Sequence, residues 1–448
     1  MIAIPLIIIF ISFILIVRYK KWPIYLFMAF YCILPEYFAI ELSETLPLIT
    51  ASRIVLLILM VYCCISSNQK NKLSLKLKHI RLFWPILIYF VLRIVVNLYH
   101  VFFTPSAIKE LFVILFEQLF LLITVVAVIN SKKVLLRAIQ ILIYACGIVS
   151  VFAIQETFTG INIAYYLNTV NREMLQVSYL RLGILRAEFS FGHPVYFAAF
   201  CVLMIPLIMY FYENTKFKRY LIIMVLDFIA LFLSCSRGSL FIAIFILILM
   251  ICNKRWSQLK LYLKWIPVFV VVIMIIILCF SNFTELIHSI FNSLVQVFNN
   301  NMLVSNYGEN AEGLSSRVIQ LTGIQWVLQN HPIFGFGANA NGRGLVRYLA
   351  DGVWKDSSTY DIGYVEFIME EGIVGFVAQV LLLIALVIQS FKKSDKSNSA
   401  NFNNALFYCF LAYTLSLTSA VGLESVYWIL IALFVSFNNL NEDISEYL

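Results

Sequence analysis

Two arginines with the chemistry to bind a phosphate stand between apolar segments of this chain. Arg237 lies in LSCSRGS, a short polar stretch between two apolar runs, and Arg317 lies in SSRVIQL, within the longest polar passage. A guanidinium is planar and can hold a phosphate through two parallel hydrogen bonds. The chain topology puts both arginines on the outer face, from which the positive-inside rule depletes basic residues. A snorkelling or topology role is the alternative, and we favour phosphate binding.

Carboxylates mark the return of the polar passage to an apolar segment, namely Asp351, Asp356, Asp361 and Glu366. A carboxylate at such a boundary can act as a general base. Asp361 could equally begin the helix expected from Gly363, where an acid favours the helix dipole. Glu366 lies deeper in the apolar segment, where an ionisable side chain indicates function. Asp361 and Glu366 are therefore both candidate catalytic groups.

Two histidines and two glycines complete the candidates. His193 and His331 each precede a proline. A structural hydrogen bond is the favoured role of both, with substrate contact by His193 and catalysis by His331 as alternatives.

The spacing of Gly335, Gly337 and Ala340 resembles a dinucleotide fingerprint, but that motif needs a preceding strand and a βαβ unit, so we reject it. We expect the two glycines to form tight turns whose backbone N–H groups contact an anion.

The composition indicates a membrane protein. Of the 448 residues, 62% are hydrophobic and only 12% are charged, whereas soluble domains have about 25% charged residues. The net charge of +8 comes mostly from short connectors between apolar runs, so it does not indicate nucleic acid. The nine cysteines lack metal-ligand spacing or an evident pairing pattern. No metal and no cofactor are expected.

Apolar runs long enough to span a bilayer, about 20 residues each, recur along the whole chain. They predict an all-α polytopic membrane protein of about 12–13 transmembrane helices with one large outer loop. The expected spans are 2–17, 22–40, 48–66, 82–102, 108–129, 134–156, 191–212, 220–235, 238–252, 264–281, 363–391, 402–418 and 423–437. Basic residues cluster in alternate connectors, which places the N-terminus outside and the C-terminus inside.

The first run begins at Ile2 without a basic leader or a cleavage site, so we interpret it as a retained helix. Both flanks of 220–252 are basic, so this run should form a hairpin that turns at Ser234–Ser239, with Gly238 relaxing the turn. Polar groups in or near spans are expected to pair within the bundle, namely Arg53, Arg93, Asn97, Glu110, Glu117 and Asp227.

Four regions follow from this pattern. Residues 1–156 form N-terminal transmembrane helices, and 157–281 form transmembrane helices with the SRG hairpin. Residues 282–362 form the large outer loop with short helices, and 363–448 form the C-terminal transmembrane helices. A second outer loop, about 157–190, contains Arg186 and Glu188. Loops of this length are usually functional or disordered.

Four motifs in order resemble the O-antigen ligase/polymerase superfamily. They are the SRG turn, Ser315-x-Arg317 followed by Trp326, HPIFGFG (331–337) and YVEFIMEEGIVG (364–375), and the similar part runs from about Arg186 to Gly375. The resemblance implies a metal-independent, GT-C-type glycosyltransferase acting on undecaprenyl-diphosphate-linked glycans at the outer face of the bacterial cytoplasmic membrane. Arg237 and Arg317, with Arg186, would hold the lipid diphosphate.

The resemblance leaves the reaction open. In the ligase branch a His-Asn pair usually precedes the last motif, whereas this chain has Asp361-Ile362. We therefore favour a polymerase of repeat units for an O-antigen, capsule or exopolysaccharide. A flippase and a chain-length regulator would be its partners besides the lipid bilayer and the lipid-linked glycans. The alternatives are a ligase that transfers glycan to lipid A-core or protein, and a lipid-linked sugar transporter, although no repeat halves typical of transporters are visible.

Overall fold

The computed structural model describes residues 22–41, 47–65, 82–170, 179–181, 184–252, 314–350, 352–357, 359–391, 398–419 and 424–440. The spans expected at 2–17 and 264–281, and the start of the loop expected at 282–362, lie outside these residues. The described part is mostly helical, and the chain is an all-α polytopic membrane protein. Within the described ranges, five helices are long and apolar enough to cross a membrane, at Phe83–Val101, Ser106–Val128, Lys132–Thr159, Pro194–Thr215 and Gly363–Phe391.

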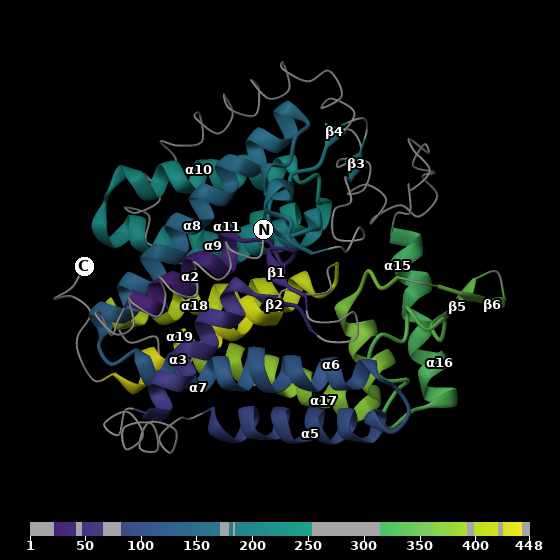
Figure 1. The fold of residues 1–448 in the computed structure, drawn as a ribbon. Coiled ribbons are helices and arrows are strands. Elements are labelled where there is room, and N and C mark those ends of the chain that lie inside the picture. The colour runs from purple at the N-terminus through teal and green to yellow at the C-terminus, as the bar shows by residue number, and fades with distance from the viewer. Residues whose placement is uncertain are drawn as a thin grey trace.

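The helices lie side by side in a bundle, with a small polar layer at one end (Figure 1). The bundle helices are α2 (Trp22–Ile33), α3 (Ala51–Ile65), α5 (Phe83–Val101), α6 (Ser106–Phe112), the π-helix η1 (Val113–Phe120), α7 (Leu121–Val128), α8 (Lys132–Thr159), α9 (Pro194–Thr215), α10 (Lys218–Leu233), α11 (Arg237–Cys252), α17 (Gly363–Phe391), α18 (Asn398–Ser416) and α19 (Glu424–Asn439). The polar layer contains the 3-10 helix η2 (Ile163–Leu167), α15 (Leu314–Leu321) and α16 (Gly323–Asn330).

Three short antiparallel ladders lie between these helices. They pair β1 (Ala39–Ile40) with β2 (Ile49–Thr50), β3 (Leu180–Arg181) with β4 (Ile184–Leu185), and β5 (Arg347–Ala350) with β6 (Val353–Asp356). In the longest ladder Arg347 faces Asp356 across the strands, and their side chains form an ion pair of 2.7 Å. Each ladder holds a connector in place rather than building a sheet domain.

Helix α9 is the centre of the bundle. It is apolar on all sides, as expected of a helix that is buried all round, and 89% of its most apolar window is buried inside the protein. Helices α8, α10, α11 and α18 pack around it, while α5 and α18 pack against α17. Consecutive helices run in opposite directions, so alternate connectors meet at one end of the bundle. These are the connectors after α2, α5, α8 and α10 and the segment before α17. We call this end the loop end of the bundle.

The hairpin expected within 220–252 is confirmed, because α10 and α11 are separate helices joined at Ser234–Ser236. The expected role of Gly238 is wrong. The left-handed residue of the turn is Cys235, with φ of 52°, and Gly238 lies in the first turn of α11. Its lack of a side chain serves packing instead, since an added Cβ would lie 2.8 Å from the Ser419 Oγ.

The segment after Ser315 forms two helices, α15 and α16, with a break at Thr322. Val318, Leu321 and Leu328 recur at helical spacing along them, but this apolar stripe is largely exposed, at 59%, 47% and 44% respectively. Gly323 allows α16 to lie close to α17, because a Cβ at this position would overlap the Met369 side chain of α17.

Candidate active site

Two arginines of the connector after α8 are tied to the SRG turn. Arg181 Nη1 donates to the Cys235 carbonyl oxygen at 2.9 Å, and Arg186 Nε donates to the Ser234 carbonyl oxygen at 2.8 Å. The backbone N–H of Ala187 also donates to the Leu233 carbonyl, at 3.2 Å. These contacts satisfy the carbonyls at the end of α10 and fix both guanidinium groups beside the turn.

Two further arginines reach the same place from other elements. Arg237 is the first residue of α11, and Arg317 lies on α15. A Cβ built on Gly238 would lie 3.8 Å from Arg317 Nη1, which places this guanidinium beside the SRG turn. Arg237 lies within electrostatic range of Arg181, Arg186 and Arg317. We call Arg181, Arg186, Arg237 and Arg317 the arginine cluster.

Like charges and burial act together in the arginine cluster. Burial, followed by the neighbouring Arg181, lowers the pKa of Arg186 to about 10. Burial also lowers the pKa of Arg181, and Arg317 adds to this effect. The pKa of Arg317 is lowered by burial too, but Asp361 opposes the shift. Such a concentration of guanidinium groups favours an anion that can take several charge-assisted hydrogen bonds.

The two candidate carboxylates differ in their surroundings. Asp361 Oδ2 accepts a hydrogen bond of 2.5 Å from Gln320 Nε2, and its backbone N–H donates to Gln320 Oε1 at 2.9 Å. Asp361 is thereby fixed to α15, the helix of Arg317. Glu366 is half-buried in the first turn of α17 and lies within electrostatic range of Tyr196 on α9. Asp361 therefore lies beside the arginine cluster, and both carboxylates lie within electrostatic range of Tyr348 on β5.

His193 has a structural role that sequence reasoning favoured. It is the N-cap of α9, and its Nδ1 accepts a hydrogen bond of 3.2 Å from the Val195 N–H. Its ring packs against those of Tyr179 at 4.6 Å and Tyr196 at 5.0 Å. Burial and the nearby Arg186 lower the pKa of His193 to about 4, so it is neutral at pH 7. It supports the arginine cluster from below α9 rather than titrating there.

The HPIFGFG segment is docked on a kink of α17. The kink is at Gly372, whose φ of 64° and ψ of −162° break the helix. The Met369 carbonyl freed there accepts from Phe336 N–H at 2.8 Å, and the Glu370 carbonyl accepts from Gly337 N–H at 2.9 Å. In return the Ile373 N–H donates to the Pro332 carbonyl at 2.9 Å.

This docking corrects the expected anion contact of the two glycines. The Gly337 N–H is bonded to the kink, and the Gly335 N–H donates to the His331 carbonyl at 3.0 Å. Gly335 is needed for close approach, because its Cβ would lie 2.5 Å from the backbone nitrogen of Gly372. His331 is the exposed C-cap of α16 and packs its ring against Phe336 at 4.9 Å. Among the described residues, no hydrogen bond or ring contact joins His331 to the arginine cluster, so the structure does not bring it to the other candidates.

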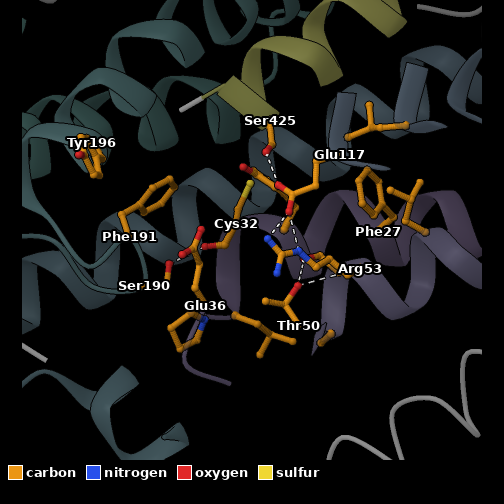
Figure 2. Close-up of a pocket in the computed structure, with 17 residues that line it drawn as sticks. Phe27, Cys32, Glu36, Thr50, Arg53, Glu117, Ser190, Phe191, Tyr196 and Ser425 are labelled. Carbon is orange, nitrogen blue, oxygen red and sulfur yellow. Dashed lines mark hydrogen bonds and ion pairs between the residues drawn. The ribbon is translucent and has the colours of Figure 1, made fainter. Parts of the chain in front are cut away.

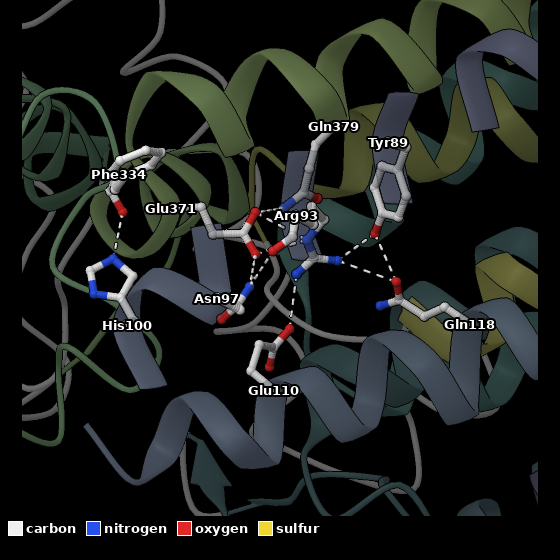
Figure 3. A network of polar contacts seen from close by, with 9 residues as sticks. All are labelled: Tyr89, Arg93, Asn97, His100, Glu110, Gln118, Phe334, Glu371 and Gln379. Carbon is white, nitrogen blue, oxygen red and sulfur yellow. Dashed lines mark hydrogen bonds and ion pairs between the residues drawn. The ribbon is translucent and has the colours of Figure 1, made fainter. Parts of the chain in front are cut away.

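Next to the kink, Glu371 anchors a buried polar network (Figure 3). Arg93 Nε donates to both carboxylate oxygens of Glu371, at 2.7 and 3.0 Å, and Arg93 Nη2 lies 2.9 Å from Glu110. Asn97 and Gln379 donate to Glu371 at 3.4 and 3.3 Å. The expectation that these polar groups pair within the bundle is confirmed. We call this the Arg93 network.

The other polar groups expected to pair also do so. Arg53 forms an ion pair with Glu117, with 2.5 Å between Nε and Oε1, and Asp227 accepts from the Cys146 thiol at 3.2 Å. Glu117 lies on η1, next to Gln118, which accepts from Arg93 at 3.3 Å. The π-helix thus directs two successive side chains into two different networks, and such helices are frequent at functional sites.

Sequence reasoning missed three contributors to the site. Arg181 was visible as a basic residue in an outer loop, and the same positive-inside argument could have selected it. Gln320 carried no signal, because a glutamine on a short helix is usually solvated. Gly372 stands in MEEGIVG, and only the structure shows that it breaks α17. Among the residues that the structure describes, no three His, Cys, Asp or Glu side chains are grouped as a metal site would require.

The fold and this cationic site define a polytopic helical membrane protein with four arginines gathered at the loop end. Residues 222–380, which extend from α10 to the first half of α17, match the family model described as O-antigen ligase. The match supports the resemblance of this region to the O-antigen ligase/polymerase superfamily. The match includes Arg237, Arg317, Asp361 and Glu366. No curated protein matches the chain.

Proposed function

We propose that this protein polymerises undecaprenyl-diphosphate-linked oligosaccharide repeat units into a surface polysaccharide. The observation that carries the proposal is the arginine cluster, in which three separate elements bring four guanidinium groups to one turn. A lipid diphosphate offers several oxygens and at least two negative charges to such a site. The family match supports a ligase or polymerase type of function and, with it, a lipid-linked glycan as the substrate.

The reaction is a transfer of glycan from diphosphate to a sugar hydroxyl. The acceptor oxygen forms a bond to the anomeric carbon of the donor, and the bond between that carbon and the diphosphate oxygen breaks. The hydroxyl proton passes to a carboxylate, and undecaprenyl diphosphate leaves with the bonding electrons. Arg237 and Arg317, supported by Arg181 and Arg186, stabilise the charge that develops on the leaving diphosphate. No metal is needed for that step.

The surroundings of the carboxylates divide their roles. Asp361 is bonded twice to Gln320 and lies within electrostatic range of Arg317, so it positions this arginine. Glu366 is half-buried in the first turn of α17 and lies within electrostatic range of Tyr196 on α9. We assign Glu366 as the general base.

The choice of a polymerase over a ligase rests on Asp361-Ile362. A base at that position would need a free side chain, and Asp361 is held by Gln320 at 2.5 Å. The acceptor is then a second lipid-linked repeat unit. In this proposal the site faces the outer side of the cytoplasmic membrane with the N-terminus outside. A flippase supplies the substrate, and a chain-length regulator acts on the product.

The test is polymerisation by the purified full-length protein in liposomes, with a synthetic undecaprenyl-diphosphate repeat unit and EDTA. Arg237→Ala and Arg317→Ala should each lower the rate by roughly 10²–10³-fold, the loss typical of removing one donor to a developing oxyanion. Arg347→Ala is the matched control, because Arg347 pairs with Asp356 on the exposed β5–β6 ladder. A ladder of products that persists in EDTA and in the control supports the proposal. Transport of labelled lipid across the bilayer without elongation would overturn it.

A further inference from the structure

A second candidate site is a cavity of about 110 Å³ at the loop end, separate from the arginine cluster. It lies between the ends of α2, α3, η1, α9 and α19 (Figure 2). A cavity of roughly 150 Å³ admits a six-membered ring. This one is open on one side, where Glu36 is exposed. It can take one face of a sugar ring while the rest of the molecule remains outside.

The charges of this cavity exclude the donor diphosphate. Its charged side chains are Glu36, Arg53 and Glu117, so its formal charge is −1. Glu117 is neutralised by Arg53 and also accepts a hydrogen bond of 2.9 Å from Ser425 Oγ. Among the described residues, no hydrogen bond to the Glu36 carboxylate is found. Glu36 therefore remains as an acceptor that faces the open space, and an anion would be repelled there.

The remaining wall suits a carbohydrate. The rings of Phe27, Phe191 and Tyr196 offer apolar faces to the C–H side of a sugar, and the hydroxyls of Thr50 and Ser190 lie between them. A carboxylate has four lone-pair positions and can accept hydrogen bonds from two neighbouring sugar hydroxyls. A mostly apolar wall with a few polar groups is typical of small-ligand sites.

Two connections join the cavity to the proposed reaction centre. The connector before α9 carries Arg186 of the arginine cluster and, a few residues later, Ser190 and Phe191 of the cavity wall. Tyr196 lines the cavity and lies within electrostatic range of Glu366, the proposed base. A sugar held in the cavity would thus lie beside Tyr196 and near the proposed base.

Building on the proposed function, we propose that this cavity binds a sugar of the acceptor repeat unit, with Glu36 accepting two of its hydroxyls. The cavity selects the acceptor by its uncharged sugar, and the arginine cluster selects the donor by its diphosphate. The two substrates therefore bind to different elements of the same bundle end.

The test separates donor from acceptor. The donor is an undecaprenyl-diphosphate repeat unit whose accepting hydroxyl is blocked, and the acceptor is the repeat unit on a simple alkyl chain without phosphate. Glu36→Gln should raise the KM for the acceptor roughly tenfold or more, because a hydrogen bond to a charged group is lost, and should leave the KM for the donor unchanged. Asp356→Asn, an exposed carboxylate outside the cavity, is the matched control.

A binding measurement distinguishes this inference from the proposed function. The alkyl repeat unit is titrated against the full-length protein, its Glu36→Gln variant and its Arg317→Ala variant. Binding that weakens only with Glu36→Gln supports the cavity even if no transfer occurs. Unchanged binding and acceptor KM in Glu36→Gln, or a change in the donor KM alone, would overturn the inference while leaving the polymerase proposal intact.

Discussion

The Arg93 network and the arginine cluster show two different fates of arginine in one membrane protein. Arg93 is buried and its guanidinium meets two carboxylates, Glu371 and Glu110, at 2.7 and 2.9 Å. In the arginine cluster, the hydrogen bonds of Arg181 and Arg186 go to main-chain carbonyls, which carry no net charge. Asp361 is the carboxylate fixed beside it. Arg93 is thus paired with two carboxylates, whereas the described hydrogen bonds of Arg181 and Arg186 leave their positive charge in place.

We infer from this difference that the Arg93 network supports the fold and that the arginine cluster binds a ligand. A neutralised ion pair in the bundle fixes the arrangement of helices, here α5 against the kink of α17. An excess of like charge destabilises the folded protein. A cluster of like charges therefore favours the binding of a ligand of opposite charge. The two groups are linked through the chain, because Glu371 precedes Gly372, on which the HPIFGFG segment docks. The Arg93 network thus supports the loop that leads to the arginine cluster.

The largest expected effect is loss of stability on breaking the Arg93 network. Arg93→Ala leaves Glu371 buried without its bidentate partner, and breaking a buried pair in this way costs about 3–5 kcal/mol. Thermal unfolding in detergent measures the loss. Arg181→Ala is the counterpart in the arginine cluster: it removes a repelled charge together with the hydrogen bond to the Cys235 carbonyl, so the melting temperature should fall far less than in Arg93→Ala. If Arg181→Ala proves as destabilising as Arg93→Ala, the distinction between the two groups fails.

The next effect concerns the docking between the kink and the HPIFGFG segment. Gly335→Ala places a Cβ 2.5 Å from the Gly372 backbone nitrogen and also strains a residue with φ of 69°. We expect a loss of about 2–4 kcal/mol, the sum of backbone strain and overpacking. Gly344→Ala is the matched control, since Gly344 has φ of 68° but open space around it. Its loss, from strain alone, should be clearly smaller in the same unfolding measurement. Equal losses would mean that the close approach contributes nothing.

Much of the fold was predictable because a bilayer leaves few choices. Apolar length and connector charge located the helices of the described bundle and the α10–α11 hairpin, since both follow from the cost of unpaired polar groups in lipid. The side that α15 and α16 bury was not predictable. Their periodicity indicated an apolar buried stripe, but Val318 and Leu321 are exposed and Gln320 is buried, because Asp361 needs its amide.

Part of the candidate site was also predictable from the constraints that a membrane places on charged residues. Charge on the disfavoured side of a membrane indicated Arg237 and Arg317, which the structure brings near one another. Partners far apart in sequence gave no signal: Arg93 and Glu371 are 278 residues apart, and Arg53 and Glu117 are 64 apart. The cavity of Glu36 could not be foreseen either, because five helices form it and none carries a motif.

The smallest expected effect is a pH dependence of the stability of the fold, caused by a carboxyl group next to the arginine cluster. Glu188 is buried; one carboxylate oxygen accepts from the Tyr165 hydroxyl at 2.7 Å, and the other has no hydrogen-bond partner among the described residues. Burial is the main cause that raises the pKa of Glu188 from 4.5 to about 8. The folded protein therefore keeps this proton at pH 7, and Glu188 does not neutralise Arg186. The excess charge of the arginine cluster depends on that proton.

The direction of the effect follows from proton linkage. Above pH 4.5 the unfolded chain has lost the Glu188 proton while the folded protein retains it up to about pH 8, so stability falls as pH rises through this window. His193, whose pKa is lowered to about 4, acts below pH 6.5 in the opposite direction. Between pH 6.5 and 8 we expect Glu188 to contribute a loss of about 1 kcal/mol per pH unit. In Glu188→Gln, which keeps the acceptor for Tyr165, this part of the slope should vanish in thermal unfolding. A slope unchanged in the variant would show that Glu188 is already ionised at neutral pH, and the arginine cluster would then be less cationic than its geometry indicates.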